Sequence, residues 1–409
     1  MNRYDRLYEL YEAFDTGTLR QYQRFADVFP PVDSRVALEQ WEAVTEELER
    51  RKAKITNTTP DDGAWAEIVA RVSREQAFTA LDLHATYGRP VNVLVLDVDE
   101  TLRSAGSTDN EIPRATLALL SSFHENEVPI VICTGQTLEN VKGFAIQGLG
   151  SALVHSGSVS IVYEGGTGVF TPGHGAATKR LLYDDLDEEV IAVFETLRAR
   201  ALSTATDTVS RGCHLQGNEF NVTIKPNYPT GSDRARDLIE RALVHLIDLV
   251  GEIVAGEPTG SRWARATYAA DPDIAAVLDR NELRVDPENV SIPEQAAQTF
   301  ERIDVAYYEA DAAEVASLEL NKVAGVKTAF EILEVTDPFA AVLGDSKTDL
   351  RVMEWLTAQN AGVAAAPSHA AEAVLEHVRD TDDLVFEPGR SADMLRIIEA
   401  LNRLDGMTT

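Results

Sequence analysis

The spacing of hydrophobic residues changes along the chain, and these changes predict where helices and strands lie. Between residues 91 and 155, short β-branched runs alternate with longer segments of mixed polarity. We predict strands over residues 91–96, 128–133 and 152–155, and helices over 114–125 and 138–146. Buried parallel strands are continuous apolar runs, and strands that alternate with helices indicate a doubly wound parallel sheet.

The same alternation returns near residue 318. We predict a helix over residues 326–333, strands over 340–343, 361–366 and 384–386, and a closing helix over 391–404. The sequence therefore predicts one Rossmann-like α/β domain in two segments, 88–168 and 318–409, with an insertion between them.

The inserted segment, residues 169–317, has a different pattern. Apolar and polar residues alternate as in a half-buried strand at Phe220, Val222 and Ile224. Residues 235–249 have apolar positions at helical spacing, so we expect a separate α+β module. The glycine-rich stretch 164–175 lacks the spacing of a phosphate-binding loop, and we interpret it as a hairpin or a hinge into the insertion.

Residues 1–87 are predicted to form a helical extension. Two sets of apolar residues have helical spacing: Leu7, Leu10, Tyr11 and Phe14, and then Trp65, Ile68, Val69 and Val72. Residues 29–31 and 58–63 are predicted breaks because they contain proline or glycine. This segment has no catalytic constellation, and we interpret it as a packing element or as the interface of a homo-oligomer.

Composition narrows the class of protein. The 409 residues are 44% hydrophobic and carry a net charge of −30, which opposes nucleic-acid binding because that binding depends on phosphate neutralisation. We expect no membrane-spanning segment, and the charged N-terminus does not resemble a signal peptide. With Cys133 and Cys213 as the only cysteines, we expect a reducing cytoplasmic location, with Cys133 in the core. The acidic surface fits either adaptation to high salt or an ordinary acidic enzyme.

Pairs of acids follow two of the predicted strands. Asp97 and Asp99 come directly after residues 91–96, and Asp345 and Asp349 follow residues 340–343. Ligands of open α/β sheets bind beyond the carboxyl ends of the strands. Carboxylates that converge there would repel one another and need a cation, and oxygen ligands without a nearby Cys/His cluster favour Mg²⁺.

Four segments in order resemble the motifs of the haloacid dehalogenase (HAD) superfamily of phosphohydrolases. They are Asp97-Val98-Asp99-Glu100-Thr101, Thr134-Gly135 after a strand, Lys327 near a helix start, and Gly344-Asp345-Ser346-Lys347-Thr348-Asp349. The resemblance covers roughly residues 88–165 and 318–405. The insertion lies where the Cof-like and sugar-phosphate phosphatase branch, and eukaryotic-type phosphomannomutases, carry a C2-type cap.

The resemblance implies a role for each matched residue. Asp97 would be the nucleophile that forms an aspartyl-phosphate, and Asp99 the general acid and base, with its backbone carbonyl on the metal. Asp97, Asp345 and Asp349 would hold Mg²⁺. Thr134, the amide of Gly135 and Lys327 would bind the phosphoryl oxygens.

Ordinary structural roles compete with three of these assignments. Thr134 could be a strand-end cap, Lys327 a solvated helix residue and Asp349 a first-turn acid. Two residues also depart from the family pattern, because Gln136 stands where arginine is common and Ser156 where asparagine is common. These two residues border the substrate in the family, so the departures affect which substrate is inferred more than which reaction is inferred.

The resemblance favours a Mg²⁺-dependent phosphatase that acts on a small phosphate monoester, such as a sugar phosphate. Lys225, in the predicted insertion strand, is a candidate contact for the organic part of the substrate or simply a solvated lysine. A phosphomannomutase-like phosphomutase is one alternative. A non-catalytic HAD-like scaffold that binds partners through its N-terminal helices is another.

Overall fold

The computed structural model describes residues 2–28, 35–58, 63–103, 111–218, 220–228 and 230–407. Two compact units emerge: residues 1–180 together with 325–409, and residues 181–324. The chain passes between the two units twice. The second passage lies between Ala324 and Gly325, inside the helix Lys322–Ile332. The predicted break at 29–31 lies outside the described residues, as does most of the break at 58–63.

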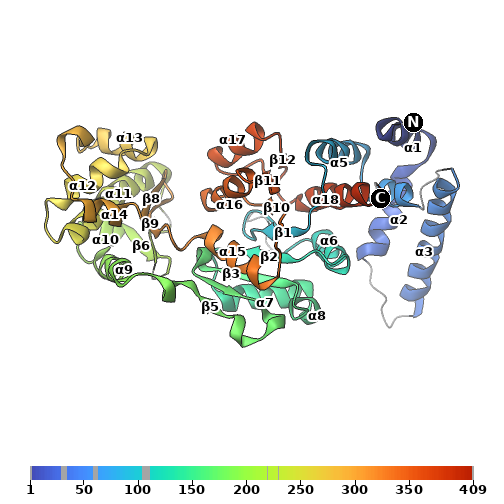
Figure 1. The fold of residues 1–409 in the computed structure, drawn as a ribbon, viewed down its shortest axis with the longest axis horizontal. Coiled ribbons are helices and arrows are strands. Elements are labelled where there is room, and N and C mark those ends of the chain that lie inside the picture. The colour runs from blue at the N-terminus through green and yellow to red at the C-terminus, as the bar shows by residue number, and fades with distance from the viewer. Residues whose placement is uncertain are drawn as a thin grey trace. The chain divides into compact units, whose positions relative to one another are not determined.

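The first unit is built on a mostly parallel sheet (Figure 1). Among the described residues the strand order is β12-β11-β10-β1-β2-β3-β4-β5. The strands are β1 (Val93–Leu96), β2 (Ile130–Cys133), β3 (Val159–Tyr163), β4 (Gly168–Phe170), β5 (Arg180–Leu181), β10 (Ala340–Leu343), β11 (Gly362–Pro367) and β12 (Leu384–Phe386). From β12 to β3 every pairing is parallel, which confirms the predicted α/β fold class.

Helices cover both faces of this sheet, as a doubly wound fold requires (Figure 1). One group comprises α5 (Arg74–Tyr87), α6 (Arg114–Glu125), α7 (Leu138–Leu149) and α18 (Ser391–Gly406). The other comprises α15 (Lys322–Ile332), α16 (Lys347–Thr357) and α17 (Glu372–Asp380). The central strands β1, β2 and β10 are buried along their whole length, so the core lies between these two helix layers.

One predicted strand is wrong. Residues 152–155 belong largely to the short helix α8 (Ser151–Val154), and the next strand is β3, which follows it. A four-residue apolar run fits a buried helical turn as well as a strand. The β-branched run of β3 pairs instead with β2, and β3 and β4 then form the predicted hairpin within the glycine-rich stretch.

The N-terminal segment is helical, as predicted. Its helices are α1 (Arg3–Ala13), α2 (Thr16–Val28), α3 (Arg35–Thr56), α4 (Ala64–Arg71) and α5. Ser73 and Gln76 form a capping box at the start of α5, and Gly88 ends that helix with a left-handed φ of 64°. Both α4 and α5 pack on α18, so this segment is part of the first unit and not a free arm.

The second unit is an α+β module. Its sheet has the order β6-β7-β9-β8 and is antiparallel throughout. The strands are β6 (Cys213–Gln216), β7 (Asn221–Pro226), β8 (Ile303–Tyr308) and β9 (Ala312–Ser317); the helices are α9 (Glu188–Arg200), α10 (Asp207–Gly212), α11 (Ser232–Ala255), α12 (Gly260–Tyr268), α13 (Pro272–Arg280) and α14 (Glu294–Phe300). The long helix α11 covers β7 and β9 with its apolar face.

Two smaller expectations can also be compared with the structure. Cys133 is buried in β2, as predicted for a core residue. No helix in the described part of the chain combines the length and the apolar character that crossing a bilayer requires.

Candidate active site at the carboxyl ends of β1 and β10

The two acid pairs meet because β1 and β10 are neighbouring parallel strands. Leu96 is in register with Leu343, and the amide of Asp97 donates a hydrogen bond of 2.9 Å to the Leu343 carbonyl. Carboxylate oxygens of Asp97, Asp345 and Asp349 all lie within 4.8 Å of one another. The structure therefore brings Asp97 next to Asp345 and Asp349, which lie about 250 positions later in the sequence.

The three carboxylates form a set of donors that suits a hard divalent cation. Opposite ligands of an octahedral Mg²⁺ ion lie about 4.2 Å apart, since each bond is 2.0–2.1 Å, and carboxylate oxygens that all lie within 4.8 Å of one another are compatible with this span. Two like charges at this separation repel by roughly 3.5 kcal/mol at an effective dielectric constant of about 20. Asp97 is only 6% exposed, so water compensates little of this repulsion. A bound Mg²⁺ would relieve it, and Asp97, Asp345 and Asp349 are the residues that would hold the ion.

Hydrogen bonds fix the loop that carries Asp345. The buried Thr101 hydroxyl donates to Asp345 Oδ1 at 3.1 Å. Asp349 Oδ2 accepts hydrogen bonds from the Ser346 amide at 3.1 Å and from the Ser346 hydroxyl at 2.6 Å. Asp349 therefore closes the capping box at the start of α16 while it contributes an oxygen to the cluster.

Gly344 is required by the close approach of Asp349. A Cβ atom on Gly344 would lie 2.3 Å from Asp349 Cβ and 2.4 Å from Asp349 Cγ. Carbon atoms in contact normally lie 3.5–4.0 Å apart, so only glycine leaves room for Asp349 in its present position.

Asp99 lies beside the acid cluster and has its own partners. Arg103 Nε donates to Asp99 Oδ1 at 2.9 Å, and Gln136 Nε2 donates to Asp99 Oδ2 at 2.6 Å. The Asp99 side chain remains 47% exposed. Both oxygens of the predicted general acid are thus engaged, one by a cation and one by a neutral amide.

Thr134 and Gly135 follow β2, the other neighbour of β1. Thr134 is fully buried, and its hydroxyl oxygen accepts a hydrogen bond from the Gln136 amide at 3.2 Å. Its backbone links to β3 and the turn beyond it, through the Val162 carbonyl at 2.9 Å and the Gly165 amide at 3.0 Å. Gly135 is exposed, and a Cβ there would meet nothing within 4 Å.

The predicted site lysine, Lys327, lies on the exposed side of α15. Its ammonium group is 5.1 Å from the centre of the Trp355 ring, on α16. This cation–π contact is a structural role that the sequence pattern did not indicate.

The sequence analysis missed a second lysine in the same helix. Lys322 is the first residue of α15 and is 4% exposed. Three residues later, Gly325 packs against Val162, whose carbonyl binds the Thr134 amide. A buried lysine almost always has a charged or polar partner, and its place at the helix start was the signal that could have found it.

The candidate substrate contact Lys225 is engaged within the second unit. Its ammonium group lies 3.2 Å from both carboxylate oxygens of Asp311. The ion pair accounts for this lysine without a ligand.

The chain is similar to several known proteins in structure but not in sequence. No family model matches the sequence, and no curated protein matches it either. The chain is similar to the solved structure of trehalose-6-phosphate phosphatase from Aspergillus fumigatus, with 15% identity, a TM-score of 0.41, and coverage of 80% of this chain and 97% of that one. It is also similar to a haloacid dehalogenase-like hydrolase from Bacteroides thetaiotaomicron, with 13% identity, a TM-score of 0.40, and coverage of 76% and 98%. A third similar structure, a HAD-superfamily phosphatase from the same organism, has 14% identity, a TM-score of 0.41, and coverage of 77% and 96%. Solved structures similar to this chain therefore include phosphatases of the superfamily that its four sequence motifs resemble.

Proposed function

We propose that the protein is a HAD-type, Mg²⁺-dependent phosphatase that hydrolyses a small phosphate monoester through an aspartyl-phosphate. The observation that carries this proposal is the convergence of Asp97, Asp345 and Asp349 beyond two adjacent parallel strands. A sugar phosphate is the substrate class that the resemblance favours, and residues 181–324 would serve as the cap that selects it.

The first half-reaction transfers the phosphoryl group to the protein. An Asp97 carboxylate oxygen bonds to phosphorus as the bond to the ester oxygen breaks, and Asp99 gives that oxygen its proton. Mg²⁺ would supply charge neutralisation between the anionic carboxylate and the anionic phosphate. Arg103 and Gln136 hold Asp99 in place beside the Asp97 loop.

The second half-reaction restores Asp97. Asp99, now a carboxylate, takes a proton from water, whose oxygen bonds to phosphorus as the bond to Asp97 breaks. Inorganic phosphate and the free Asp97 carboxylate are the products. Thr134 and the Gly135 amide would donate hydrogen bonds to the phosphoryl oxygens.

We propose that Lys322 binds the phosphoryl group, and Lys327, which the resemblance implies, is the alternative. Lys322 is buried at the start of α15, whereas Lys327 is exposed over Trp355. A buried ammonium group is shielded from water and stabilises developing negative charge better than a solvated one.

The test is phosphate release from a panel of sugar phosphates, nucleotides and phosphoglycolate, with and without Mg²⁺. We expect activity that EDTA removes. Asp97→Asn should lower turnover more than about a thousandfold, equivalent to ~4 kcal/mol of transition-state stabilisation. Asp380→Asn, which changes an exposed aspartate at the end of α17, is the matched control and should be fully active. Turnover by Asp97→Asn equal to that of the unmodified protein would refute the mechanism.

A further inference from the structure

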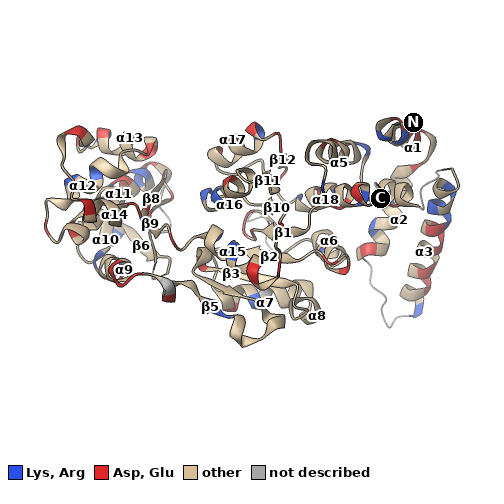
Figure 2. Cartoon of the chain, viewed as in Figure 1, with Lys and Arg blue, Asp and Glu red and all other residues tan. Residues whose placement is uncertain are grey.

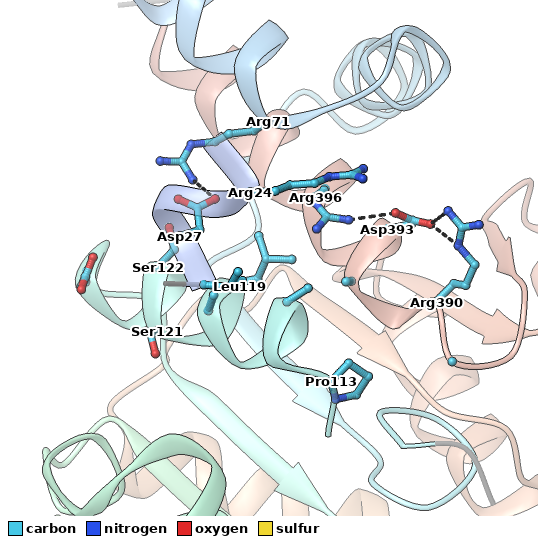
Figure 3. Close-up of a pocket in the computed structure, with 16 residues that line it drawn as sticks. Arg24, Asp27, Arg71, Pro113, Leu119, Ser121, Ser122, Arg390, Asp393 and Arg396 are labelled. Atoms are coloured by element: carbon cyan, nitrogen blue, oxygen red, sulfur yellow. Dashed lines mark hydrogen bonds and ion pairs between the residues drawn. The ribbon is translucent and has the colours of Figure 1, made fainter. Parts of the chain in front are cut away.

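The N-terminal helices and the α/β domain together enclose a pocket of about 580 Å³ (Figure 3). Its walls come from the ends of α2 and α4 on one side, and from α6 and the start of α18 on the other. Pockets that hold small molecules are typically 300–1,000 Å³. The pocket is formed by the first unit alone and does not include any of the acids that follow β1 and β10.

The charge of this pocket is opposite to that of the protein. Its charged lining residues are four arginines and three acids: Arg24, Arg71, Arg390 and Arg396, with Asp27, Glu125 and Asp393. The whole chain, in contrast, carries a net charge of −30, and Figure 2 shows acidic residues on helices such as α9 and α13. An arginine-rich pocket in so acidic a protein needs an explanation.

Arg71 is fully accounted for by the packing of α4. Its guanidinium lies 3.6 Å from Asp27, 3.6 Å from Glu399 and 3.4 Å from Glu67. These ion pairs tie α4 to α2 and α18. Arg71 therefore belongs to the architecture of the pocket wall, and its charge is already balanced.

The other three arginines share too little negative charge. Asp393 accepts hydrogen bonds from Arg390 at 2.6 Å and from Arg396 at 2.9 Å, so one carboxylate serves two guanidinium groups. Among the described residues, Arg24 makes no ion pair and no side-chain hydrogen bond. Glu125 is the other acid of this part of the wall, and it is exposed. Asp27, which pairs with Arg71, also attracts Arg396. The four arginines and three acids of the lining therefore leave one positive charge without a matching acid.

Arg24 and Arg396 also repel each other. Arg396 is buried, and this burial, together with the charge of Arg24, lowers the pKa of its guanidinium. Figure 3 shows both side chains directed into the same part of the pocket. Arg24 is exposed, whereas Arg396 is buried, and the repulsion between two such like charges costs stability unless an anion lies between them.

We propose that this pocket binds a compact anion with at least two negative charges, through Arg24, Arg390 and Arg396. Arginine presents a planar fork of donors that matches phosphate and carboxylate oxygens. Phosphorylated metabolites and polycarboxylates share this chemistry. A bound anion would supply the charge that Asp393 alone cannot, and it would join α2 to α18.

Isothermal titration calorimetry and thermal unfolding of the full chain test the proposal. Pyrophosphate and citrate are the two probes, used in EDTA-containing buffer so that no metal links them to the carboxylate cluster. We expect at least one probe to bind saturably and to raise Tm, with binding that weakens as KCl increases. The stronger of the two probes identifies the phosphate or the carboxylate source.

Arg24→Ala is the decisive variant because, within the described part of the chain, Arg24 makes no ion pair and no side-chain hydrogen bond whose loss would destabilise the fold. Without ligand, its Tm should equal or exceed that of the unmodified protein, since a repulsion with Arg396 is removed. Its affinity for the probe should fall about tenfold or more, the effect of losing one hydrogen bond to a charged group. Arg24→Lys should recover part of this affinity. Arg35→Ala, which removes an exposed arginine of α3 that pairs with Glu39, should bind like the unmodified protein.

Two results would overturn the proposal. One is the absence of saturable binding for both probes. The other is equal affinity in Arg24→Ala and the unmodified protein, which would place the anion elsewhere. Neither result depends on phosphatase activity, so the outcome is independent of the proposed catalytic function.

Discussion

Substitution of Gly344 by alanine would test how tightly the carboxylate cluster is packed. The added methyl group would lie 2.3 Å from Asp349 Cβ and 2.4 Å from Asp349 Cγ. A carbon–carbon contact needs 3.5–4.0 Å, so the two groups must separate by more than about 1 Å. Asp349 is 3% exposed and sits in the first turn of α16, so it has little freedom to move away.

The cost follows from the hydrogen bonds that this movement breaks. Asp349 Oδ2 accepts from the Ser346 amide and from the Ser346 hydroxyl. Hydrogen bonds to a charged group contribute about 1.5–3 kcal/mol each, so loss of both costs about 3–6 kcal/mol in the free energy of unfolding. A loss of about 4 kcal/mol lowers Tm by roughly 10 °C. Misplacement of one carboxylate should also weaken Mg²⁺ binding, by about 10–100-fold on the scale of displaced outer-shell partners.

Thermal unfolding and a Mg²⁺ titration measure the two effects separately. Gly135→Ala is the matched control, because a Cβ there meets nothing within 4 Å and the backbone amide is kept. We expect this control to unfold and to bind Mg²⁺ like the unmodified protein. If Gly344→Ala did the same, the packing argument for Asp349 would be wrong.

Three further predictions concern other parts of the chain. Lys322→Ala should lower kcat/KM about a hundredfold, because removal of one preorganised charged donor has that effect. Lys327→Ala should lower kcat/KM less than about threefold. Equal effects of the two substitutions in a steady-state assay would contradict the choice of Lys322. Gln136→Ala should lower kcat more than it raises KM, because it frees one oxygen of Asp99, and an unchanged kcat would exclude a positioning role. His245 is half-buried in α11, and this partial burial lowers its pKa below the ordinary value near 6.5. The unfolded state then binds more protons, so stability should be fully present above about pH 6.5 and fall as the pH drops below it, by at most about 1.4 kcal/mol per pH unit. Urea unfolding between pH 7 and 5 should show that the free energy of unfolding depends less on pH in His245→Gln than in the unmodified protein. Identical slopes in the two proteins would contradict this prediction.

The main features of the fold could be predicted because they depend on local sequence. Continuous apolar runs of four residues correspond to β1, β2 and β10, and each is buried along its whole length. Their carboxyl ends lie at one edge of a parallel sheet, so Asp97 and Asp345 could be expected to meet. The helical N-terminus followed in the same way from apolar residues at helical spacing.

The remaining features depend on contacts between distant residues. Residues 152–155 are apolar enough for a strand, but the neighbour of β2 is β3, and only the completed sheet decides between them. The two lysines of α15 are five positions apart, and a motif alone does not say which one is buried. Burial of Lys322 and the cation–π contact of Lys327 depend on how α15 packs, which the sequence pattern does not contain.

The partners of Asp99 explain why one departure from the family pattern is compatible with the proposed chemistry. Gln136 stands where an arginine is common, yet its amide donates 2.6 Å to Asp99, while Arg103 supplies the positive charge four residues after Asp99. A second arginine at position 136 would add another positive charge beside the same carboxylate. Glutamine orients Asp99 without that added charge. The loop after β1 therefore supplies the positive charge near Asp99 through Arg103, and the loop after β2 orients the Asp99 side chain through Gln136.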